Sequence, residues 1–337
     1  VQWVDDNIDL INSIASDPIH DKRWHDAAEP WSYLAACLEF KACVIDGTRD
    51  TSGLMCGIDA TASGLQHLAA LTLCGDTSEE VNVTPTEKPG DIYRTVAEAA
   101  KKYMPEKFHP WMDRKKTKRS VMCCPYGVTQ SSSRNYIRLA LKEAGHEFTS
   151  QDLTVITNAI FKKAIPEVLP GPIAVMKWLK QSAIDILDSG KESIQWTTPS
   201  GFVVNQDLRI SNTIEVQTRL MGGARIKSTI ADGFLGPDRS HHRSALAPNA
   251  VHSMDSALLH LTFAFWDKPF SVIHDCVMGR SCDMDAMAAE IRLHFAEMYK
   301  APVLQQWADQ VGVQLDPDLI KNTLDLESVN QSTYFFC

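Results

Sequence analysis

The sequence predicts an α+β fold, and three observations lead to that prediction. Apolar residues recur at helical spacing in much of the chain, for example at Ile8, Ile11 and Ile14 and again in the segment 31–44, which follows a proline. Short apolar runs at 54–58 and 270–273 have the length of buried strands. The segment 193–220 alternates apolar and polar residues around a Ser-Gly turn, as paired strands do.

The remaining elements follow from turn residues and apolar periodicity. Turn-forming residues fill 75–90, a helix begins at Asp91, and prolines break the helical pattern within 156–186. Further predictions, in chain order, are a loop and helix after Gly127, a charged, histidine-containing loop at 237–250, a helix at 251–265, a return strand after Asp275, and a helical tail from Asp283 to about Gln305.

Composition sets the broad class of protein. The 337 residues are 44% hydrophobic and 22% charged, which is typical of a soluble chain with one large domain or two. No apolar run approaches the ~20 residues that span a bilayer, so no membrane partner is expected. The acidic start is not a signal peptide and lacks an initiator Met, so we expect a processed or trimmed chain, or one cut from something longer. Nine cysteines without a CxxC pair indicate reduced thiols in a cytosol-like compartment and argue against zinc.

Charge is distributed unevenly. The net charge of -9 argues against nucleic acid as a partner, yet residues 101–119 contain eight Lys or Arg against only Glu106 and Asp113. One basic zone on an acidic protein predicts a focused anion site.

The stretch RKKTKRSVMCCPYG, at 114–127, supplies the centre of this zone. Arg114 and Lys118 are four residues apart and therefore share one face of a helix, which Met122 continues. Pro125 should end the helix, so Tyr126 lies at or just past its exit. A planar Arg fork and a compact Lys charge together suit a polyphosphate, although a lone basic helix is more often simply solvated.

Two aspartates share a setting. Asp59 and Asp275 each follow an apolar strand, and Asp59 precedes a Gly-containing turn and a helix. Asp59 alone is equally well explained as a metal ligand or as a helix N-cap. If both strands are neighbours in one sheet, the two carboxylates meet at one edge and can hold Mg²⁺ for in-line phosphoryl displacement.

These blocks, in this order, resemble the bacteriophage-type single-subunit RNA polymerase family, which includes phage and mitochondrial enzymes. The matching segments are DATASGLQH (59–67), RKKTKRSVMCCPYG (114–127), PNAVHSMD (248–255) and IHDCVMG (273–279), and the terminal YFFC resembles the family's C-terminal foot. The resemblance implies a right-hand polymerase without a thumb, with a palm at 1–69 and 253–337 and fingers at 70–252.

The resemblance also implies a role for each matching residue. Asp59 and Asp275 would bind two Mg²⁺ ions, with the Ala60 carbonyl assisting. Lys118 would bind the triphosphate and donate a proton to pyrophosphate, and His274 would neighbour the primer terminus. The other implied nucleotide-binding residues are Arg114, Arg119, Met122 and Gly127 around the phosphates, and Tyr126 and His252 at the ribose.

The implied partners are a DNA template, an RNA product and ribonucleoside triphosphates, in the cytoplasm of an infected bacterial host rather than a mitochondrion. The chain departs from the family at Cys123, Cys124 and Pro125, which leaves the end of the helix open. It also lacks the N-terminal domain, the thumb and the upstream palm motif. We therefore expect either a cut fragment or the catalytic subunit of a split enzyme, with a second protein chain supplying the missing parts.

Two other functions compete with this interpretation. A family A DNA polymerase shares the paired aspartates and the Lys/Tyr helix, but it excludes the ribose 2′-OH with a bulky side chain, whereas here the turn is Ala62-Ser63-Gly64. His252 could bond that hydroxyl, and a site built to bond a group rejects the analogue that lacks it. A non-catalytic nucleic-acid-binding relative would need charge but not paired carboxylates.

Three weaker features complete the predictions. The hairpin at 201–230 resembles the family's promoter specificity loop, and a plain solvent-facing hairpin explains any single residue of it equally well. His241 and His242 are predicted to be exposed rather than metal ligands, and Cys123 and Cys124 to serve packing rather than redox chemistry. The candidate readers of DNA in the hairpin are Gln206, Arg209, Gln217 and Arg219.

Overall fold

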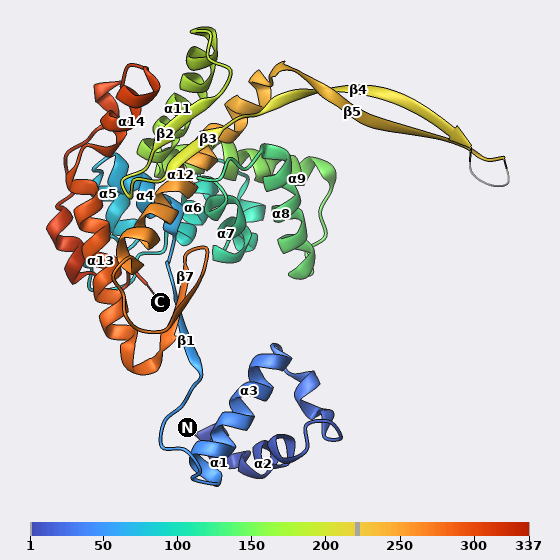
Figure 1. The fold of residues 1–337 in the computed structure, drawn as a ribbon, viewed down its shortest axis with the longest axis vertical. Helices are drawn as coiled ribbons and strands as arrows, with labels where there is room; N and C mark the ends of the chain where they lie inside the picture. The colour runs from blue at the N-terminus through green and yellow to red at the C-terminus, as the bar shows by residue number, and fades with distance from the viewer. Residues whose placement is uncertain (1, 220–222, 337) are drawn as a thin grey trace. The chain divides into compact units, whose positions relative to one another are not determined.

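Helices joined to three small antiparallel sheets make up the computed structural model, which describes residues 2–219 and 223–336 and confirms the predicted α+β fold (Figure 1). The predicted strand end at Leu220 and the last residue of the predicted foot, Cys337, lie outside the described residues. The chain divides into two units, residues 1–59 with 267–288 and residues 60–266 with 289–337. The palm and fingers boundaries stay a prediction.

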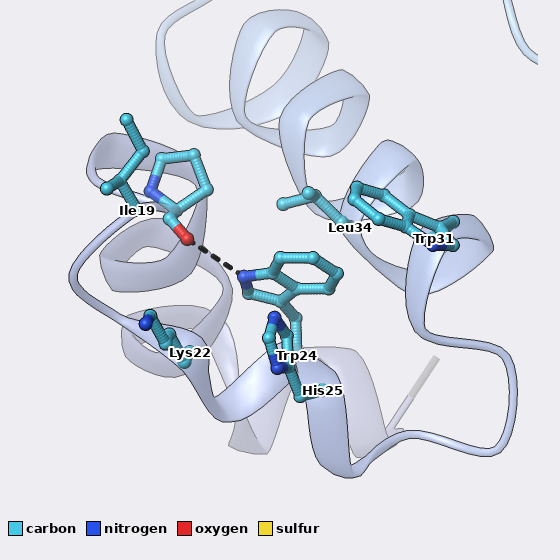
Figure 2. A pocket seen from close by; sticks show the side chains of 7 residues that line it. Ile19, Lys22, Trp24, His25, Trp31 and Leu34 are labelled. Carbon is cyan, nitrogen blue, oxygen red and sulfur yellow. Dashed lines mark hydrogen bonds between the residues drawn. The ribbon is translucent and has the colours of Figure 1, made fainter. Parts of the chain in front are cut away.

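The first unit begins with short helices that pack around a small core. Ile11, Ile14 and Trp24 are buried there, and Trp24 Nε1 donates to the Pro18 carbonyl at 2.9 Å (Figure 2). Figure 2 also shows Trp31 beside this ring, at the edge of a cavity of about 450 Å³. The elements are α1 (Gln2–Asp6), α2 (Ile8–Ser16), the 3₁₀ turn η1 (Lys22–Asp26), α3 (Pro30–Phe40) and the π-helical turn η2 (Lys41–Ile45).

The same unit contains the sheet that carries both aspartates. Strands β1 (Met55–Asp59), β7 (Cys276–Arg280) and β6 (Phe270–Ile273) lie in the order β1-β7-β6, and every pairing is antiparallel. Val277 on the central strand is fully buried. The apolar strands that precede Asp59 and Asp275, β1 and β6, belong to one sheet, but they are not the neighbours that the prediction assumed, because the return strand β7 lies between them. Beyond β7 the chain turns through η5 (Ser281–Asp283) into α13 (Met284–Lys300).

The second unit is mostly helical. Its buried residues include Leu68, Val96, Val121, Ile160 and Phe295. Its helices are α4 (Ser63–Leu71), α5 (Gly75–Glu80), α6 (Ile92–Lys101), η3 (Glu106–Trp111), α7 (Arg114–Met122), α8 (Gln130–Glu143), α9 (Ser150–Thr157), η4 (Asn158–Ala164), α10 (Ile165–Val168), α11 (Pro170–Asp188), α12 (Arg239–Phe263), the end of α13, α14 (Val303–Val311), η6 (Pro317–Leu319) and η7 (Leu326–Gln331).

The predicted alternation at 193–220 corresponds to strands of two separate sheets. Strands β2 (Ile194–Thr197) and β3 (Val203–Gln206) pair around the expected turn, where Gly201 has a φ of 82°. Strands β4 (Arg209–Arg219) and β5 (Arg225–Pro237) form a long, mostly exposed ribbon (Figure 1). Within the described part of the chain, no helix has the length and apolar character needed to cross a membrane.

Two sequence predictions about helix limits are wrong, and the segment 75–90, expected to consist of turns, begins with the short helix α5. The segment 237–250 was expected to be a loop, but α12 begins at Arg239 because Asp238 caps it, accepting a hydrogen bond from the His241 N–H at 2.9 Å. Pro248 lies inside this helix without ending it. The helical tail predicted to reach Gln305 is interrupted, because α13 ends at Lys300 and α14 starts directly after Pro302.

Candidate active site

Asp59 and Asp275 come together at one end of the three-stranded sheet. Asp59 is the last residue of β1 and lies opposite Cys276, the first residue of β7, so Asp275 is one position from direct register with Asp59. Burial raises the pKa of the Cys276 thiol, and the negative charges of Asp59 and Asp275 raise it further. Asp59 is not a helix N-cap, since that position of α4 belongs to Ala62. The N-cap alternative is therefore excluded.

A two-residue turn presents Asp275. Ile273 pairs with Cys276, so His274 and Asp275 form the whole loop of the β6–β7 hairpin. His274 has a φ of 55°, the positive value that two-residue hairpins require at their first central position. His274 is exposed and Asp275 is half-buried. This tight turn fixes Asp275 beside the end of β1 without a flexible linker.

The carboxylate pair fits a magnesium site. Mg²⁺ prefers oxygen ligands and is commonly bound by one or two carboxylates together with substrate phosphates and water. The described residues contain no group of three or more His, Cys, Asp or Glu able to hold a metal. Ala60 follows Asp59 directly, and its backbone forms an isolated antiparallel bridge with Phe336. That bridge fixes the backbone at Ala60, whose carbonyl is predicted to assist in metal binding.

Helix α7 is the predicted basic helix and ends where expected. Asp113 caps it by accepting a hydrogen bond from the Lys116 N–H at 3.2 Å, and the helix ends at Met122, before Pro125. The Lys116 side chain is buried, and its ammonium lies 2.6 Å from the Asp113 carboxylate. This ion pair neutralises the Lys116 charge within the protein. The helix therefore separates an internal charge on one face from exposed charges on the other.

The exposed charges of α7 differ in their partners. Arg114 Nε lies 3.1 Å from the Asp91 carboxylate, and its guanidinium lies over the Tyr93 ring at 5.1 Å. Arg119 similarly stacks over Tyr136 at 4.8 Å. Lys118 is exposed and makes no ion pair with any residue that the structure describes. Met122 is 40% exposed on the same helix. Lys118 is thus the cation of this face that is most available to an external anion.

Tyr126 and His252 form a stacked pair. Their ring centroids are 4.6 Å apart and the rings are nearly parallel, at 12°. Tyr126 follows the end of α7, whereas His252 lies on α12 and is exposed. Gly127, with a φ of 75°, turns the chain beside Pro248, whose Cγ would lie 3.0 Å from an added Cβ. The structure thus brings together two residues that the sequence places 126 positions apart.

Helix α4 joins α12 and α13 in a buried hydrogen-bond network. His67 Nε2 lies 3.1 Å from Asp255 Oδ1, and His67 Nδ1 lies 2.6 Å from the Tyr299 hydroxyl. The Ser63 hydroxyl also donates to Asp255. His67 and Tyr299 are almost fully buried, and burial followed by the Asp255 charge raises the pKa of Tyr299. Sequence reasoning missed this network, although Ser63, His67 and Asp255 all lie inside the motif blocks at 59–67 and 248–255.

The predicted DNA-reading residues differ in their exposure and in their partners. Gln206 is buried, and its amide bonds His242 at 3.0 Å and Asn249 at 2.8 Å, so this packing does not support its predicted contact with DNA. Arg209 is paired with Asp207 at 2.8 Å. Gln217 and Arg219 are exposed on the ribbon, where Arg219 lies opposite Arg225. The Gln217 amide already donates to Glu215 at 3.3 Å, so Arg219 is the one of these four residues that is exposed and has no side-chain partner among the residues that the structure describes.

His242 corrects the prediction that both histidines are exposed. His241 is exposed, but His242 is fully buried, and its Nε2 accepts from the Leu208 N–H at 3.2 Å. Burial lowers the pKa of His242. The packing prediction for the cysteine pair agrees with the structure at Cys124, where burial raises the pKa of the thiol to about 11.

Comparison with known proteins places this geometry in context. The family model described as "DNA-dependent RNA polymerase" matches residues 1–331. The chain is 29% identical to the mitochondrial DNA-directed RNA polymerase 1 of Arabidopsis thaliana, over 100% of this chain and 37% of that protein. It is 28% identical to the human mitochondrial DNA-directed RNA polymerase, over 97% of this chain and 29% of that protein. It is 30% identical to the DNA-directed RNA polymerase of Pseudomonas phage phiKMV, over 99% of this chain and 44% of that protein.

The chain thus spans less than half the length of these three relatives. Each relative carries the matched region within one longer chain, which gives no support to the predicted second chain. The relatives come from mitochondria and a phage, so the predicted location in the cytoplasm of an infected host stays a prediction.

Proposed function

The chain belongs to the DNA-dependent RNA polymerase family, and we propose that it forms the catalytic part of such an enzyme. It would transfer nucleotides from ribonucleoside triphosphates to an RNA 3′ end on a DNA template. The observation that carries this proposal is the meeting of Asp59 and Asp275 at adjacent strand ends in a chain that matches the family over residues 1–331. A right-hand arrangement, with a palm at 1–69 and 253–337 and fingers at 70–252, is part of the same proposal.

The carboxylates would bind the metal ions of the reaction. When bound by Asp59 and Asp275, two Mg²⁺ ions supply the charge that activates an attacking hydroxyl and stabilises the leaving oxygen. The Ala60 carbonyl would assist, and His274, the neighbour of Asp275 in the hairpin turn, would lie near the RNA 3′ end. The tight β6–β7 turn supports this role because it fixes the position of Asp275 before any metal binds.

Helix α7 would bind the triphosphate. Arg114, oriented by Asp91, and Lys118, unpaired among the described residues, offer a planar fork and a point charge to the phosphates. Lys118 would also give a proton to the departing pyrophosphate. The remaining residues of the proposed nucleotide site are Arg119, Met122 and Gly127.

Tyr126 and His252 would recognise the ribose. The two rings are already stacked, so no rearrangement is needed to present the Tyr126 hydroxyl and the His252 imidazole as a pair. A hydrogen bond to the 2′-OH would favour ribonucleotides, since the deoxy analogue would leave a polar group unbonded. This discrimination separates the proposed enzyme from a DNA polymerase.

The first test is extension of a labelled RNA primer on a DNA template in the presence of Mg²⁺. Asp59→Asn and Asp275→Asn keep the side-chain shape but lose a charged ligand, so each should reduce nucleotide addition by several orders of magnitude. Asp50→Asn is the matched control, because Asp50 is an exposed aspartate of the same unit. Near-normal extension by either site variant would rule out the two-metal assignment.

The second test detects the metal site without depending on activity. Mn²⁺ is a paramagnetic substitute for Mg²⁺, and its binding to the purified chain can be followed by electron paramagnetic resonance. The wild type and Asp50→Asn should bind Mn²⁺ with equal affinity, whereas each site variant should bind at least tenfold more weakly. Equal binding by all four proteins would show that these carboxylates are not metal ligands.

A further inference from the structure

We propose that Asp255 is a positioning residue for the Tyr126–His252 pair, because it fastens the helix that carries His252 to the helix against which Tyr126 packs. This inference rests on the proposed function, in which that pair recognises the ribose. It adds a residue that does not itself need to touch the nucleotide.

Helix α12 carries both Asp255 and His252. Asp255 follows His252 by three residues, which is about one helical turn, so the two side chains leave α12 on neighbouring parts of its surface. Asp255 is mostly buried, with 15% of its side chain exposed, whereas His252 is exposed. Holding the Asp255 carboxylate in place therefore fixes both the position of α12 along its axis and its rotation about that axis at His252.

Helix α4 contacts both Asp255 and Tyr126. Ser63 and His67 both bind Asp255, and they lie four residues apart on one face of this helix. Between them, Gly64 approaches Tyr126 so closely that an added Cβ would lie 2.8 Å from the Tyr126 hydroxyl oxygen. One turn of α4 therefore holds Asp255 on one side and Tyr126 on another.

These contacts form a closed circuit. Tyr126 packs on Gly64, α4 holds Asp255 through Ser63 and His67, and α12 carries His252 back to the Tyr126 ring at 4.6 Å. Loosening the Asp255 contacts frees α12 to shift relative to α4. The stack would then lose its alignment, although neither ring had been changed.

The donors and acceptors of the network agree on one arrangement. A carboxylate only accepts hydrogen bonds, so the Ser63 hydroxyl and His67 Nε2–H both donate to Asp255. His67 Nδ1 is then free to accept from the Tyr299 hydroxyl. Every partner of the buried carboxylate is thus a donor, which is the condition under which a buried charge is tolerated. An Asn at this position would present to those donors either its NH₂ group, which is itself a donor, or its amide oxygen, which is a weaker acceptor than a carboxylate oxygen.

The structural readout is the NMR signal of His252. In the stack, the Tyr126 ring current shifts the His252 ring protons away from their positions in an unstacked imidazole. In the 337-residue chain with labelled histidine, His252→Gln assigns the signal, and Tyr126→Leu gives its unstacked position. Asp255→Asn should move the signal towards that unstacked position, whereas Ser256→Ala, an exposed neighbour on α12, should not. An unmoved His252 signal in Asp255→Asn would overturn the proposal.

Sugar selectivity provides the second readout. Asp255→Asn should lower the preference for a ribonucleotide over its deoxy analogue by about tenfold, as expected for the loss of one well-placed hydrogen bond. Combined with Tyr126→Phe, it should cause little further loss, because both changes remove the same recognition. Additive losses would show that Asp255 acts independently of Tyr126 and would contradict the proposal.

Ser63→Ala keeps the experiment decisive if Asp255→Asn does not fold. It removes one donor and leaves the carboxylate bonded to His67, so a smaller change of the His252 signal is expected in the same direction. No change in this folded variant would also contradict the proposal. Absence of RNA synthesis in the wild type would instead count against the proposed function, and the NMR result would still decide the positioning role.

Discussion

Arg114 and Lys118 illustrate how residues of like charge on one helix face are prepared for different tasks. The Arg114 guanidinium is held by Asp91 and lies over the Tyr93 ring, so its direction is set before a ligand arrives. Lys118 has no ion-pair partner among the described residues, so its ammonium would be able to follow charge that develops during the proposed reaction. The two side chains should therefore contribute differently to binding and to rate.

We expect Lys118→Ala to lower kcat more than it raises the KM for the nucleotide, with a loss of about 10²-fold in kcat/KM, because a charge that acts mainly in the transition state is removed. Arg114→Ala should affect KM at least as much as kcat. Steady-state primer extension at varied nucleotide concentration measures both constants. If Lys118→Ala changed neither constant, α7 would not be the phosphate-binding helix.

Tyr126→Phe isolates the hydroxyl of the stacked pair. The ring and its contact with His252 are retained, so stability should be nearly unchanged. Losing a hydrogen bond worth about 1–3 kcal/mol should reduce selectivity against deoxynucleotides by roughly tenfold to hundredfold. Competition between a ribonucleotide and its deoxy analogue measures the effect. Unchanged selectivity in both Tyr126→Phe and His252→Ala would favour the DNA polymerase alternative.

At the scale of elements, α4 packs closely against the turn that follows α7, at Gly64. A Cβ at Gly64 would lie 2.8 Å from both the Pro125 Cβ and the Tyr126 hydroxyl oxygen. Helix propensity alone favours Ala over Gly inside a helix by about 1 kcal/mol. Here the steric clash should outweigh that gain, because one of the two contacts is with a rigid proline ring.

Gly64→Ala should therefore destabilise the protein by about 1–3 kcal/mol, the usual cost of overpacking, and should displace Tyr126. Gly171→Ala is the matched control, since Gly171 is also helical and an added Cβ would meet only the Thr72 hydroxyl at 3.7 Å. Thermal unfolding of both variants measures the difference. A Gly64→Ala protein as stable as Gly171→Ala would show that the α4–α7 contact can relax.

Elements defined by local residues were predictable, and those defined by distant partners were not. The limits of α7 follow from Asp113 and Pro125, which act within a few residues of the helix ends. The sequence also supported the hairpin that carries Asp275, because a short apolar run on either side of a polar pair is a local pattern. By contrast, the early start of α12 depends on Asp238, whose capping role is not visible among the charged residues around it.

The buried network could not be predicted for a related reason. Asp255 and Ser63 are separated by 192 residues, so no periodicity connects them. His242 was predicted to be exposed because its neighbours are polar, yet the side chain is enclosed by β3 and the Leu208 backbone. The carboxylate pair and the Tyr126–His252 pair are exceptions among the long-range features, because the resemblance to a known family linked the two members of each pair.

For the stability of the whole chain, buried His242 predicts a pH dependence of definite sign. Burial lowers its pKa, the charges of Asp207 and Asp238 oppose this shift, and nearby His241 adds to it. The unfolded chain, with a pKa near ~6.5 for histidine, therefore binds the proton more readily. The contribution of neutral His242 to the free energy of unfolding is fully present above about pH 6.5. It is lost as the pH falls from there towards the pKa of His242 in the folded protein.

Urea unfolding at pH 7.5 and pH 5.5 tests this prediction. The wild type should lose stability between the two values, and His242→Asn should lose less, because its side chain does not titrate. The exposed His241 provides the control, since His241→Asn should retain the wild-type difference. An equal loss of stability in all three proteins would assign the pH dependence to other groups.

The charge of the whole molecule restricts where the proposed DNA template would bind. With a net charge of -9, the protein as a whole repels a polyanion, so local clusters of cations must provide the attraction. At the outer part of the β4–β5 ribbon, Arg219 lies directly opposite Arg225, and Gln217 lies opposite Lys227. Like charges facing each other across a ribbon are unfavourable alone, and a bound phosphate would relieve that repulsion.

We therefore expect Arg219→Ala to weaken DNA binding to a similar extent for unrelated sequences and to reduce the slope of log K against log salt concentration by about one. Fluorescence anisotropy with a labelled duplex at several salt concentrations measures that slope. Lys300→Ala is the control, because its ammonium is already paired with Glu297 at 2.6 Å and Glu327 at 2.7 Å. A wild-type slope in Arg219→Ala would show that the ribbon does not contact phosphates, whereas a loss confined to one DNA sequence would assign Arg219 to base recognition instead.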